Sequence, residues 1–154
     1  MTARAQLAAH PIGRDLSHAQ LDRLAECAGL ARFDAGATIF AEGGPANAVY
    51  LIVEGRVSLE QYIPGRGALA LESLGRGDML GLSWMFPRGR WILDARAAEP
   101  TETVRLAADC VRAQMTEDLE LRAALTEHLV RTLYQRLERV RLQRLDVYRA
   151  EPAR

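Results

Sequence analysis

Apolar and polar residues follow three different patterns along the chain, and each pattern predicts a different structure. In residues 17–30, SHAQLDRLAECAGL, apolar positions recur with the spacing of one helical face. Ser17 is the predicted N-cap of this short N-terminal helix, because its hydroxyl can accept a hydrogen bond from a free backbone amide of the first turn. Gly29 is the predicted end of the helix, since glycine readily adopts the conformation that closes one.

Residues 31–107 follow a second pattern, in which short apolar runs alternate with glycines. The runs RVSLEQY and ALALESL alternate apolar residues with polar or small ones, as half-buried strands do. Many short strands joined by glycine-containing turns are typical of an antiparallel sheet that is closed or folded into a sandwich. The sequence Pro64-Gly65-Arg66-Gly67 is a predicted hairpin tip. We therefore predict a mainly β fold with flanking helices.

From about Ala108 the pattern becomes helical, and residues 117–149 contain neither glycine nor proline. They predict one long closing helix with an apolar stripe. The stripe consists of Leu119, Leu125, Leu129, Val130, Leu133, Leu137, Val140, Val147 and Tyr148. A helix of about 33 residues spans about 50 Å, which exceeds the width of so small a β-structure. Part of the stripe should therefore stay uncovered.

The uncovered part of this helix is the predicted partner interface, because its residues follow the near-heptad spacing of helix–helix seams. These residues are Val130, Leu133, Leu137, Val140, Arg144 and Val147. Arg122, Arg136 and Arg144 project within the stripe or at its edge, where they extend past the core into solvent or meet an acid of a partner or a ligand phosphate. We expect a homodimer or a larger protein complex. A heteromeric partner is favoured, since symmetry-related arginines repel each other.

Composition narrows the function classes. A length of 154 residues fits a single domain, residues 1–154. The net charge is zero, so no overall field draws the protein to nucleic acid or to a membrane. The first ten residues lack an apolar leader, and the longest apolar run, residues 48–53, is far shorter than the about 20 residues of a membrane span. We expect a cytoplasmic protein without a membrane partner.

Residues with catalytic or metal-binding chemistry are sparse. Cys27 and Cys110 are too few for a disulfide scaffold and are expected to be buried as small hydrophobic residues. The histidines lack metal-ligand spacing, and neither an acid–base pair nor a nucleophile–base set is visible. We therefore predict that the protein is not an enzyme, that it holds no metal, and that no cofactor is firmly implied.

Three glycine-containing motifs carry a resemblance to a known family. They are Phe33-x-x-Gly36-x-x-Ile39-Phe40-x-x-Gly43, Val49-Tyr50-Leu51-Ile52-x-x-Gly55-x-Val57 and Gly75-x-Gly77-Asp78. With the helices on either side, the chain resembles a stand-alone cyclic-nucleotide-binding domain of the catabolite-activator (Crp/Fnr) superfamily. The resemblance implies an antiparallel β-roll, or double-stranded jelly roll, over about residues 31–107, with a short N-terminal helix and a long C-terminal helix. It also makes a nucleotide the candidate ligand.

Residues 77–97, GDMLGLSWMFPRGRWILDARA, occupy the position of the family's phosphate-binding cassette and depart from its pattern. In the family, the Glu of a Gly-Glu-Leu turn binds the ribose, and the Arg of an Arg-Ser/Thr-Ala motif binds the phosphate. Here these positions are Gly81-Leu82-Ser83 and Trp91-Ile92-Leu93. Two alternatives follow. Arg90 or Arg88 turns inward and keeps an anion site, or Trp84, Trp91 and Phe86 close the pocket.

The resemblance implies a candidate ligand site with contributions from the cassette and the long helix. The residues are Gly81, Leu82, Ser83, Arg90, Trp91, Ile92, Arg131, Gln135 and Arg136. Gln135 reads a base edge or is simply an exposed helical residue. Activators of the superfamily carry a helix-turn-helix after the long helix, and we expect none here, hence no specific DNA binding.

The function expected from these observations is that of a regulatory or accessory binding module with impaired cyclic-nucleotide binding. Two alternatives stay open. The first is an accessory subunit of a multi-subunit, nicotinamide-linked redox enzyme such as a hydrogenase. It comes from the resemblance to the superfamily, relatives of which occur as accessory subunits of such hydrogenases. The chain also resembles a subgroup of small bacterial proteins of the superfamily that share Ser83-Trp84-x-Phe86-Pro87, Arg90-Trp91, Asp94-Ala95-Arg96-Ala97 and Leu145-Asp146-Val147-Tyr148. The second is a cAMP-responsive regulator that acts through a partner.

Overall fold

The computed structural model of the protein describes residues 1–86 and 88–150. Its helices are α1 (Ala3–Ala9), α2 (Pro11–Arg14), α3 (His18–Ala25), the 3-10 helix η1 (Ser83–Met85), α4 (Ala108–Glu117) and α5 (Leu119–Ala150). Its strands are β1 (Ala28–Phe33), β2 (Thr38–Phe40), β3 (Ala48–Glu54), β4 (Arg56–Ile63), β5 (Gly67–Gly75), β6 (Met79–Leu80), β7 (Asp94–Ala97) and β8 (Thr101–Ala107).

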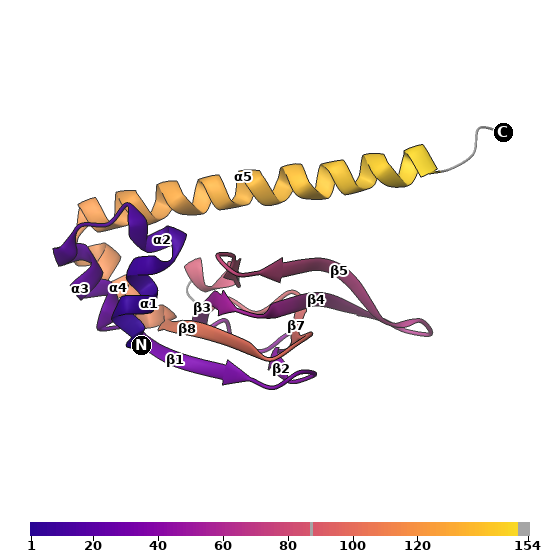
Figure 1. The fold of residues 1–154 in the computed structure, drawn as a ribbon, viewed down its shortest axis with the longest axis horizontal. Coiled ribbons are helices and arrows are strands. Elements are labelled where there is room, and N and C mark those ends of the chain that lie inside the picture. The colour runs from indigo at the N-terminus through magenta and orange to yellow at the C-terminus, as the bar shows by residue number, and fades with distance from the viewer. Residues whose placement is uncertain (87, 151–154) are drawn as a thin grey trace.

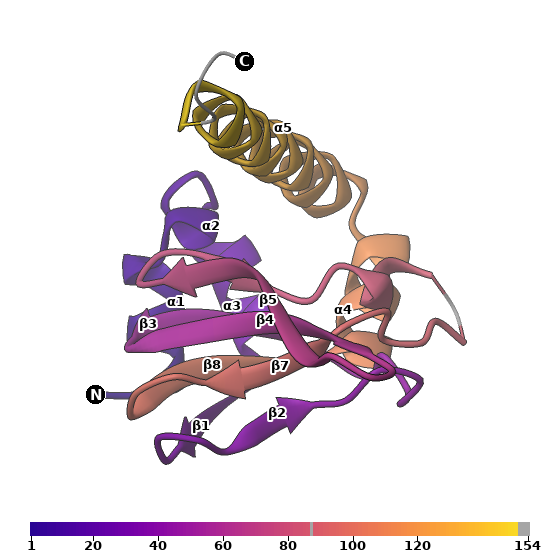
Figure 2. The same ribbon diagram turned by 90° about the vertical axis from the view of Figure 1, so that its right-hand side faces the viewer.

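The strands form two antiparallel four-stranded sheets, in the orders β1-β8-β3-β6 and β2-β7-β4-β5. Figure 2 shows the two sheets folded together as a roll, and Figure 1 shows α1–α4 at one end of it and α5 above it. Gly55, which has φ 105°, lies between β3 and β4, and a Cβ there would meet Thr101 Oγ1 at 2.5 Å, so only glycine fits this corner. The predicted fold class, an antiparallel β-roll with a short N-terminal helix and a long C-terminal helix, is confirmed.

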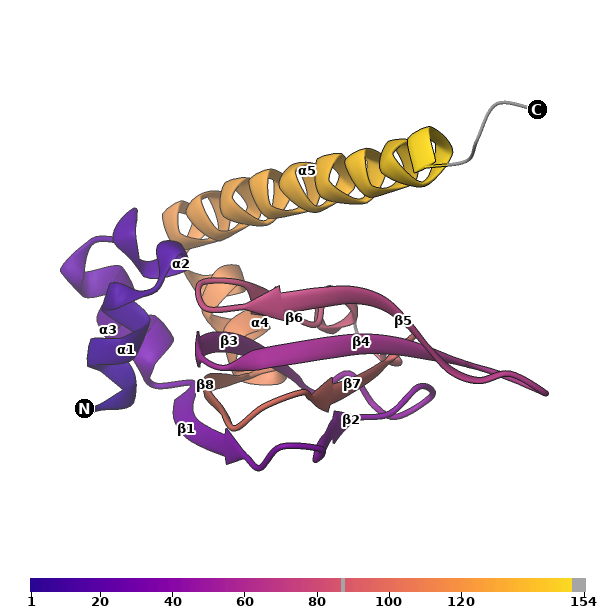
Figure 3. The ribbon, with the colours of Figure 1, turned by 45° about the vertical axis from the view of Figure 1, so that its right-hand side comes forward.

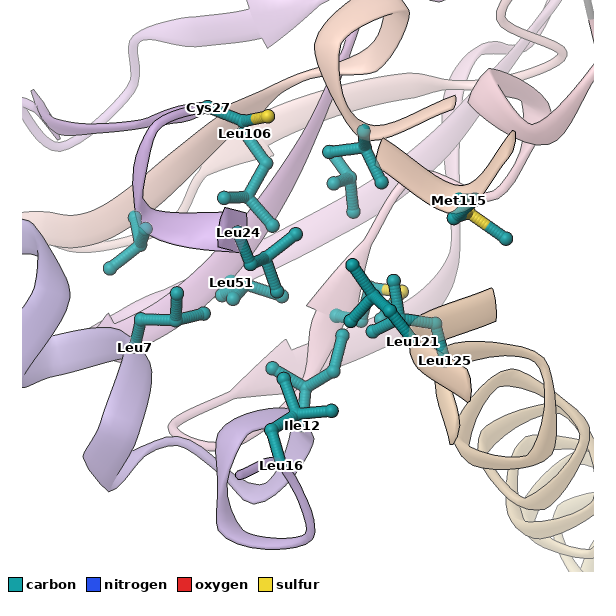
Figure 4. Close-up of a cluster of buried hydrophobic side chains, with 14 of the residues drawn as sticks. Leu7, Ile12, Leu16, Leu24, Cys27, Leu51, Leu106, Met115, Leu121 and Leu125 are labelled. Atoms are coloured by element: carbon teal, nitrogen blue, oxygen red, sulfur yellow. The ribbon is translucent and has the colours of Figure 1, made fainter. Parts of the chain in front are cut away.

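Two hydrophobic clusters hold the roll and the helices together. The larger one lies between the helices and the sheet that contains β3 and β8, and Figure 4 shows Leu7, Leu24, Leu51, Leu106 and Leu121 converging there. The smaller one fills the inside of the roll around Tyr50, Ile52, Leu59 and Leu74. Alternation along β3 supplies both clusters, because successive side chains of a strand point to opposite faces.

The N-terminal region differs from the sequence prediction in two respects. Ser17 caps α3 as predicted, and Gln20 completes a capping box with it. The predicted end at Gly29 is wrong: α3 ends at Ala25, and Gly29 lies inside β1 opposite Arg105. The helices α1 and α2 were not predicted, because each is very short and α2 begins at a proline, so neither has a repeating apolar face to recognise.

Cys27 and Cys110 form a disulfide that joins the start of β1 to α4 across a sequence separation of 83 residues. The expectation of two independent buried thiols is therefore wrong. A cross-link that closes so long a loop restricts the unfolded chain and stabilises the fold by about 4 kcal/mol in the chain-entropy description. Disulfides persist mainly in oxidising compartments, so this bond and the expected cytoplasmic location favour different environments, and the location stays a prediction.

The long helix begins at a cap rather than continuing from α4. The carboxylate of Asp118 accepts a hydrogen bond from the backbone of Leu121 at 3.0 Å, which separates α4 from α5. Leu121, Leu125 and Leu129 then pack into the larger cluster. Leu119, a member of the predicted apolar stripe, is 70% exposed, whereas Leu121, which the stripe left out, is fully buried. Beyond Leu129, α5 extends past the short helices alongside the β4–β5 hairpin (Figures 1 and 3).

Candidate functional site

A small pocket lies in the roll between the cassette segment and α5. Its volume is about 100 Å³. It is lined by Phe40, Leu59, Gly81, Leu82, Ser83, Trp91, Ile92, Leu93 and Arg136. Six of the nine candidate ligand-binding residues therefore meet at one place, namely Gly81, Leu82, Ser83, Trp91, Ile92 and Arg136. Its walls are apolar except for Ser83 and Arg136. Only these two side chains could therefore make polar contacts to a sugar or a phosphate.

Trp91 occupies the position where the family places the phosphate-binding arginine. The indole is 5% exposed and stacks on Phe40, with ring centroids 3.9 Å apart and an interplanar angle of 11°. Gly81 has φ 91°, and a Cβ at that residue would meet the indole at 2.7 Å. Glycine is thus required at residue 81 both by its backbone conformation and by the ring above it. Trp91 is packed as a core residue, and it brings no charge to the pocket.

The turn before η1 also lacks the family's polar contact. Leu82 precedes the helix, and its side chain packs partly against the larger hydrophobic cluster. The helix itself has three residues, Ser83–Met85, without a side-chain cap. So short a helix has little dipole to hold an anion, since the partial charge at a helix end grows from aligned peptide units. Leu82 brings no carboxylate to the position where the family's Glu binds the ribose.

Arg136 is the one cationic group among the pocket-lining residues, and a carboxylate of the protein already binds it. Its Nε and one terminal nitrogen donate to the two carboxylate oxygens of Glu72 at 3.0 and 2.8 Å. The side chains of Arg136 and Glu72 are 15% and 16% exposed, so this bidentate pair is mostly shielded from water. Such pairs are among the strongest side-chain hydrogen bonds. A ligand phosphate would have to compete with Glu72 for this arginine.

The other three candidate residues lie away from the pocket. Arg90 donates to the backbone oxygen of Gly43 at 3.0 Å and is exposed. Arg131 pairs with Glu127 and Asp15, and Gln135 is exposed on α5. Arg88, the other substitute for the missing arginine, is exposed with φ 60° and does not line the pocket. Pro87, between Phe86 and Arg88, lies outside the described residues.

Of the three aromatic residues expected to close the pocket, only Trp91 does so. Trp84 is 2% exposed but packs in the larger cluster with Ile12, Leu24 and Leu125, on the other side of the sheet. Phe86 is 70% exposed. The expectation that Trp84 and Phe86 fill the pocket is therefore wrong. A 3-10 helix has about three residues per turn, so neighbouring side chains of η1 point in different directions.

Sequence reasoning missed Phe40, Leu59, Leu93 and the carboxylate of Glu72. Phe40 stood in one of the family motifs, but its contact with Trp91 joins residues 51 positions apart in the chain. Glu72 could have been suspected, because it is the one acid in the alternating segment ALALESL and lies on the same strand face as the buried Leu74. An acid on the buried face of a strand requires a cation opposite it.

Comparison with protein-family models supports the resemblance, because the model of the cyclic nucleotide-binding domain matches residues 30–118. The chain belongs to the cyclic nucleotide-binding domain family. A cyclic nucleotide-binding domain from Methylobacillus flagellatus superposes with a TM-score of 0.78 at 19% identity, over 94% of this chain and 81% of that one. The sensor domain of the transcriptional regulator DNR from Pseudomonas aeruginosa superposes with a TM-score of 0.70 at 25% identity, over 88% and 91%.

One relative of this chain is a longer protein. The CRP-like cAMP-activated global transcriptional regulator of Mycobacterium tuberculosis is 30% identical over 107 residues, which is 70% of this chain and 46% of that protein. The chain thus spans about half the length of this relative. Within residues 1–86 and 88–150, no helix has both the length and the apolar character needed to cross a membrane. The same residues contain no group of three or more His, Cys, Asp or Glu side chains placed to hold a metal ion.

Proposed function

We propose that this cyclic nucleotide-binding domain works as a non-enzymatic regulatory or accessory module, which binds cyclic nucleotides weakly or not at all and docks to another protein chain through α5. The observation that carries the proposal is that the protein's own side chains already fill most of the pocket. Trp91 fills one side of it, and Glu72 holds Arg136 on the other. The remaining volume of about 100 Å³ is well below the about 300 Å³ at which ligand pockets usually begin.

The exposed part of α5 supports the docking half of the proposal. We call Val130, Leu133, Leu137, Val140, Arg144 and Val147 the outer face. Their positions repeat with spacings of three and four residues, the a and d pattern of a coiled coil, with Arg144 at an a position. The five apolar members are 46–64% exposed, so nothing within the described chain covers them. An uncovered apolar stripe of this kind is a common surface for a second helix.

The charge around the outer face favours a partner different from the chain itself. Residues 131–149 hold six arginines and only two acids, Glu138 and Asp146. In a parallel homodimer the two Arg144 side chains would face each other across the seam, where like charges repel. A helix with apolar residues and carboxylates would pair with this face more favourably. We therefore favour a heteromeric partner, with the homodimer as the other outcome.

Titration calorimetry with cAMP and cGMP tests the pocket half of the proposal. The wild type should give no heat of binding at micromolar ligand, because two charge-assisted hydrogen bonds, worth about 1.5–3 kcal/mol each, are missing. Since about 1.4 kcal/mol is tenfold in affinity, their loss weakens binding by several orders of magnitude. The double variant Leu82→Glu/Trp91→Arg should gain affinity if its fold survives, and a thermal melt checks the fold. A micromolar dissociation constant for the wild type would contradict the proposal.

The second candidate function is a cAMP-responsive regulator that acts through a partner. The position of Arg136 favours it, because α5 brings a guanidinium to the pocket from the helix that carries the outer face. A phosphate that displaced Glu72 would change how α5 is held to β5. The calorimetric experiment separates the two functions, and Glu72→Gln would increase cyclic-nucleotide affinity only under the second.

The redox-enzyme alternative is a specific form of the docking proposal. It rests on the resemblance to superfamily members that occur as accessory subunits of such enzymes. The chain also carries the motif Ser83-Trp84-x-Phe86-Pro87 and Arg90-Trp91 of a subgroup of small bacterial proteins. Within this motif, the buried Trp84 and Trp91 contribute to two different hydrophobic regions, and the motif therefore supports the packing of the fold. Sequence-specific DNA binding is not part of the proposal, and its absence stays a prediction that a footprinting assay at physiological salt can test.

A further inference from the structure

We propose a second ligand site, separate from the pocket of the roll, that binds a small phosphate-bearing molecule between the N-terminal helices and the β5–β6 turn. A cleft of about 290 Å³ lies there, nearly three times the volume of the roll pocket. It is lined by Gln6, Ala9, His10, Pro11, Arg14, Ile52, Val53, Arg76 and Gly77. The proposal does not depend on the function assigned to the roll pocket or to α5.

The cleft is built from segments that are far apart in the sequence and closely packed in space. Gly77, with φ 86°, makes the turn between β5 and β6, and a Cβ there would contact Pro11 Cγ at 3.6 Å. The backbone of Gly77 donates to Ile52 at 2.9 Å, which fixes the turn against β3. Figure 1 shows α1 and α2 at this end of the roll. The walls therefore belong to a folded framework and not to a chain terminus.

Two arginines give the cleft its chemistry. Arg14 lies at the end of α2 and Arg76 in the β5–β6 turn, and both are exposed. Within residues 1–86 and 88–149, no hydrogen bond or ion pair engages either guanidinium. The two nearby acids are already paired with α5, since Asp15 meets Arg131 at 3.5 Å and Asp78 meets Arg139 at 3.6 Å. The cleft thus has a surplus of positive charge that the protein itself does not neutralise.

His10 forms a neutral wall of this cleft. Its ring is 5% exposed, Nδ1 accepts from the backbone of Ile12, and Nε2 therefore donates to the backbone oxygen of Asp78. Burial, with smaller contributions from the charges of His128 and Arg14, lowers the pKa of His10 to about 4. Both ring nitrogens are used and the ring stays uncharged near neutral pH. Recognition of an anion is left to the arginines, with the Gln6 amide in the lining as a further donor.

The shape and composition indicate the class of ligand. Guanidinium groups match the geometry of phosphate oxygens and bind them bidentately. The apolar residues Ala9, Pro11 and Val53 line the rest of the cleft and suit an uncharged organic part. The volume, near the lower limit of about 300 Å³ for small-molecule sites, fits a small phosphate monoester and not a polymer.

The test uses the full chain with inorganic pyrophosphate and adenosine monophosphate as probes. Titrations followed by backbone amide NMR at physiological salt should saturate, with shifts confined to residues 6–14, 52–53 and 76–77. Arg14→Gln and Arg76→Gln should each weaken binding by about tenfold or more, because each removes a charge-assisted hydrogen bond. Arg66→Gln is the matched control, since Arg66 is an exposed arginine at the tip of the β4–β5 hairpin.

Each outcome of this titration decides the proposal. All three variants change an exposed side chain, so thermal melts should match the wild type and loss of binding cannot come from unfolding. Saturable binding that Arg14→Gln and Arg76→Gln weaken and Arg66→Gln leaves unchanged supports the site. Shifts that rise linearly without saturation, or an equal loss in all three variants, would show only general charge screening and would overturn it.

Discussion

The two halves of α5 have nearly opposite surroundings. In the inner half, residues 119–129, Leu121, Leu125 and Leu129 are 0–2% exposed within the larger hydrophobic cluster. In the outer half, residues 130–148, Leu133 and Leu137 are 50% and 64% exposed. One helix thus has an end that completes the core of its own chain and an end with no apolar cover (Figure 1).

The face of α5 that meets the roll changes its chemistry between these halves. Leu121, Leu125 and Leu129 are followed on the same side by Arg136 and Arg139, which pair with Glu72 of β5 and Asp78 of the β5–β6 turn. Ion pairs therefore hold the outer half beside the roll, while the apolar residues of the outer face stay 46–64% exposed. The inner half therefore completes the core of its own chain, whereas the outer face keeps the exposed apolar side chains on which the docking proposal rests.

Truncating one leucine in each half is expected to give the largest contrast in stability. Leu125→Ala should lower the free energy of unfolding by about 2–5 kcal/mol, because it leaves a cavity in the larger cluster. Leu137→Ala should change it by less than about 0.5 kcal/mol, because that side chain is already in water. Denaturant unfolding of both variants measures the difference. Equal destabilisation by the two changes would contradict the claim that only the inner half of α5 contributes to the core.

The pH dependence of stability should come from the inner end, where His10 is buried and His128 is partly buried. Burial lowers the pKa of His10 from 6.5 to about 4, and burial also lowers the pKa of His128. The unfolded chain takes up a proton below about pH 6.5, but the folded chain resists it, so stability is complete above pH 6.5 and falls as pH drops toward 4. The shift of His10 corresponds to about 3 kcal/mol.

His10→Asn isolates this contribution, because asparagine keeps a side-chain acceptor at the N-cap of α2 but does not titrate. The difference in unfolding free energy between the wild type and His10→Asn should change by about 3 kcal/mol between pH 7 and pH 4. His18→Asn, at an exposed histidine of α3, is the matched control. A pH profile that stays parallel to the wild type in His10→Asn would contradict the assignment.

The smallest of these effects concerns the tether of the outer half. Arg136→Met leaves Glu72 unpaired at a site where it is 16% exposed, and should cost about 1–3 kcal/mol of stability. Arg141→Met breaks an exposed pair with Glu138 at 3.5 Å and should cost less than about 1 kcal/mol. Hydrogen exchange of the α5 amides should rise beyond residue 132 in the first variant alone. Unchanged exchange there would show that Arg136 does not hold the outer half.

Local patterns in the sequence predicted most of the fold, and contacts between distant residues account for what they missed. The cap at Ser17, the alternating strands and the absence of helix breakers in residues 117–149 are all local signals. The disulfide between Cys27 and Cys110 and the pair between Glu72 and Arg136 join residues 83 and 64 positions apart. Periodicity carries no information about which distant residues meet.

The candidate site shows the same division. The loss of the family's polar residues at Leu82 and Trp91 was readable from the motifs, whereas the direction of each neighbouring side chain was not. Trp84 and Trp91 are both buried, yet they lie in different hydrophobic regions because η1 and the following turn separate them. The predicted stripe included Leu119 and left out Leu121. Leu121 lies one helical turn before Leu125 and two before Leu129, so helical spacing puts it on their buried face, whereas Leu119 lies about 120° away from Leu125.

Sedimentation velocity of the fluorescently tagged protein in a lysate of its native cells tests the central claim, that the outer face docks to another chain, most directly. Wild type should sediment faster than the tagged monomer, whose mass is 17.1 kDa plus that of the tag, whether the partner is another protein or a second copy. Leu133→Asp/Leu137→Asp should sediment as the monomer with an unchanged thermal melt, because both side chains are exposed in the isolated chain. If wild type and the double variant sediment alike as monomers, the outer face of α5 is not a docking surface.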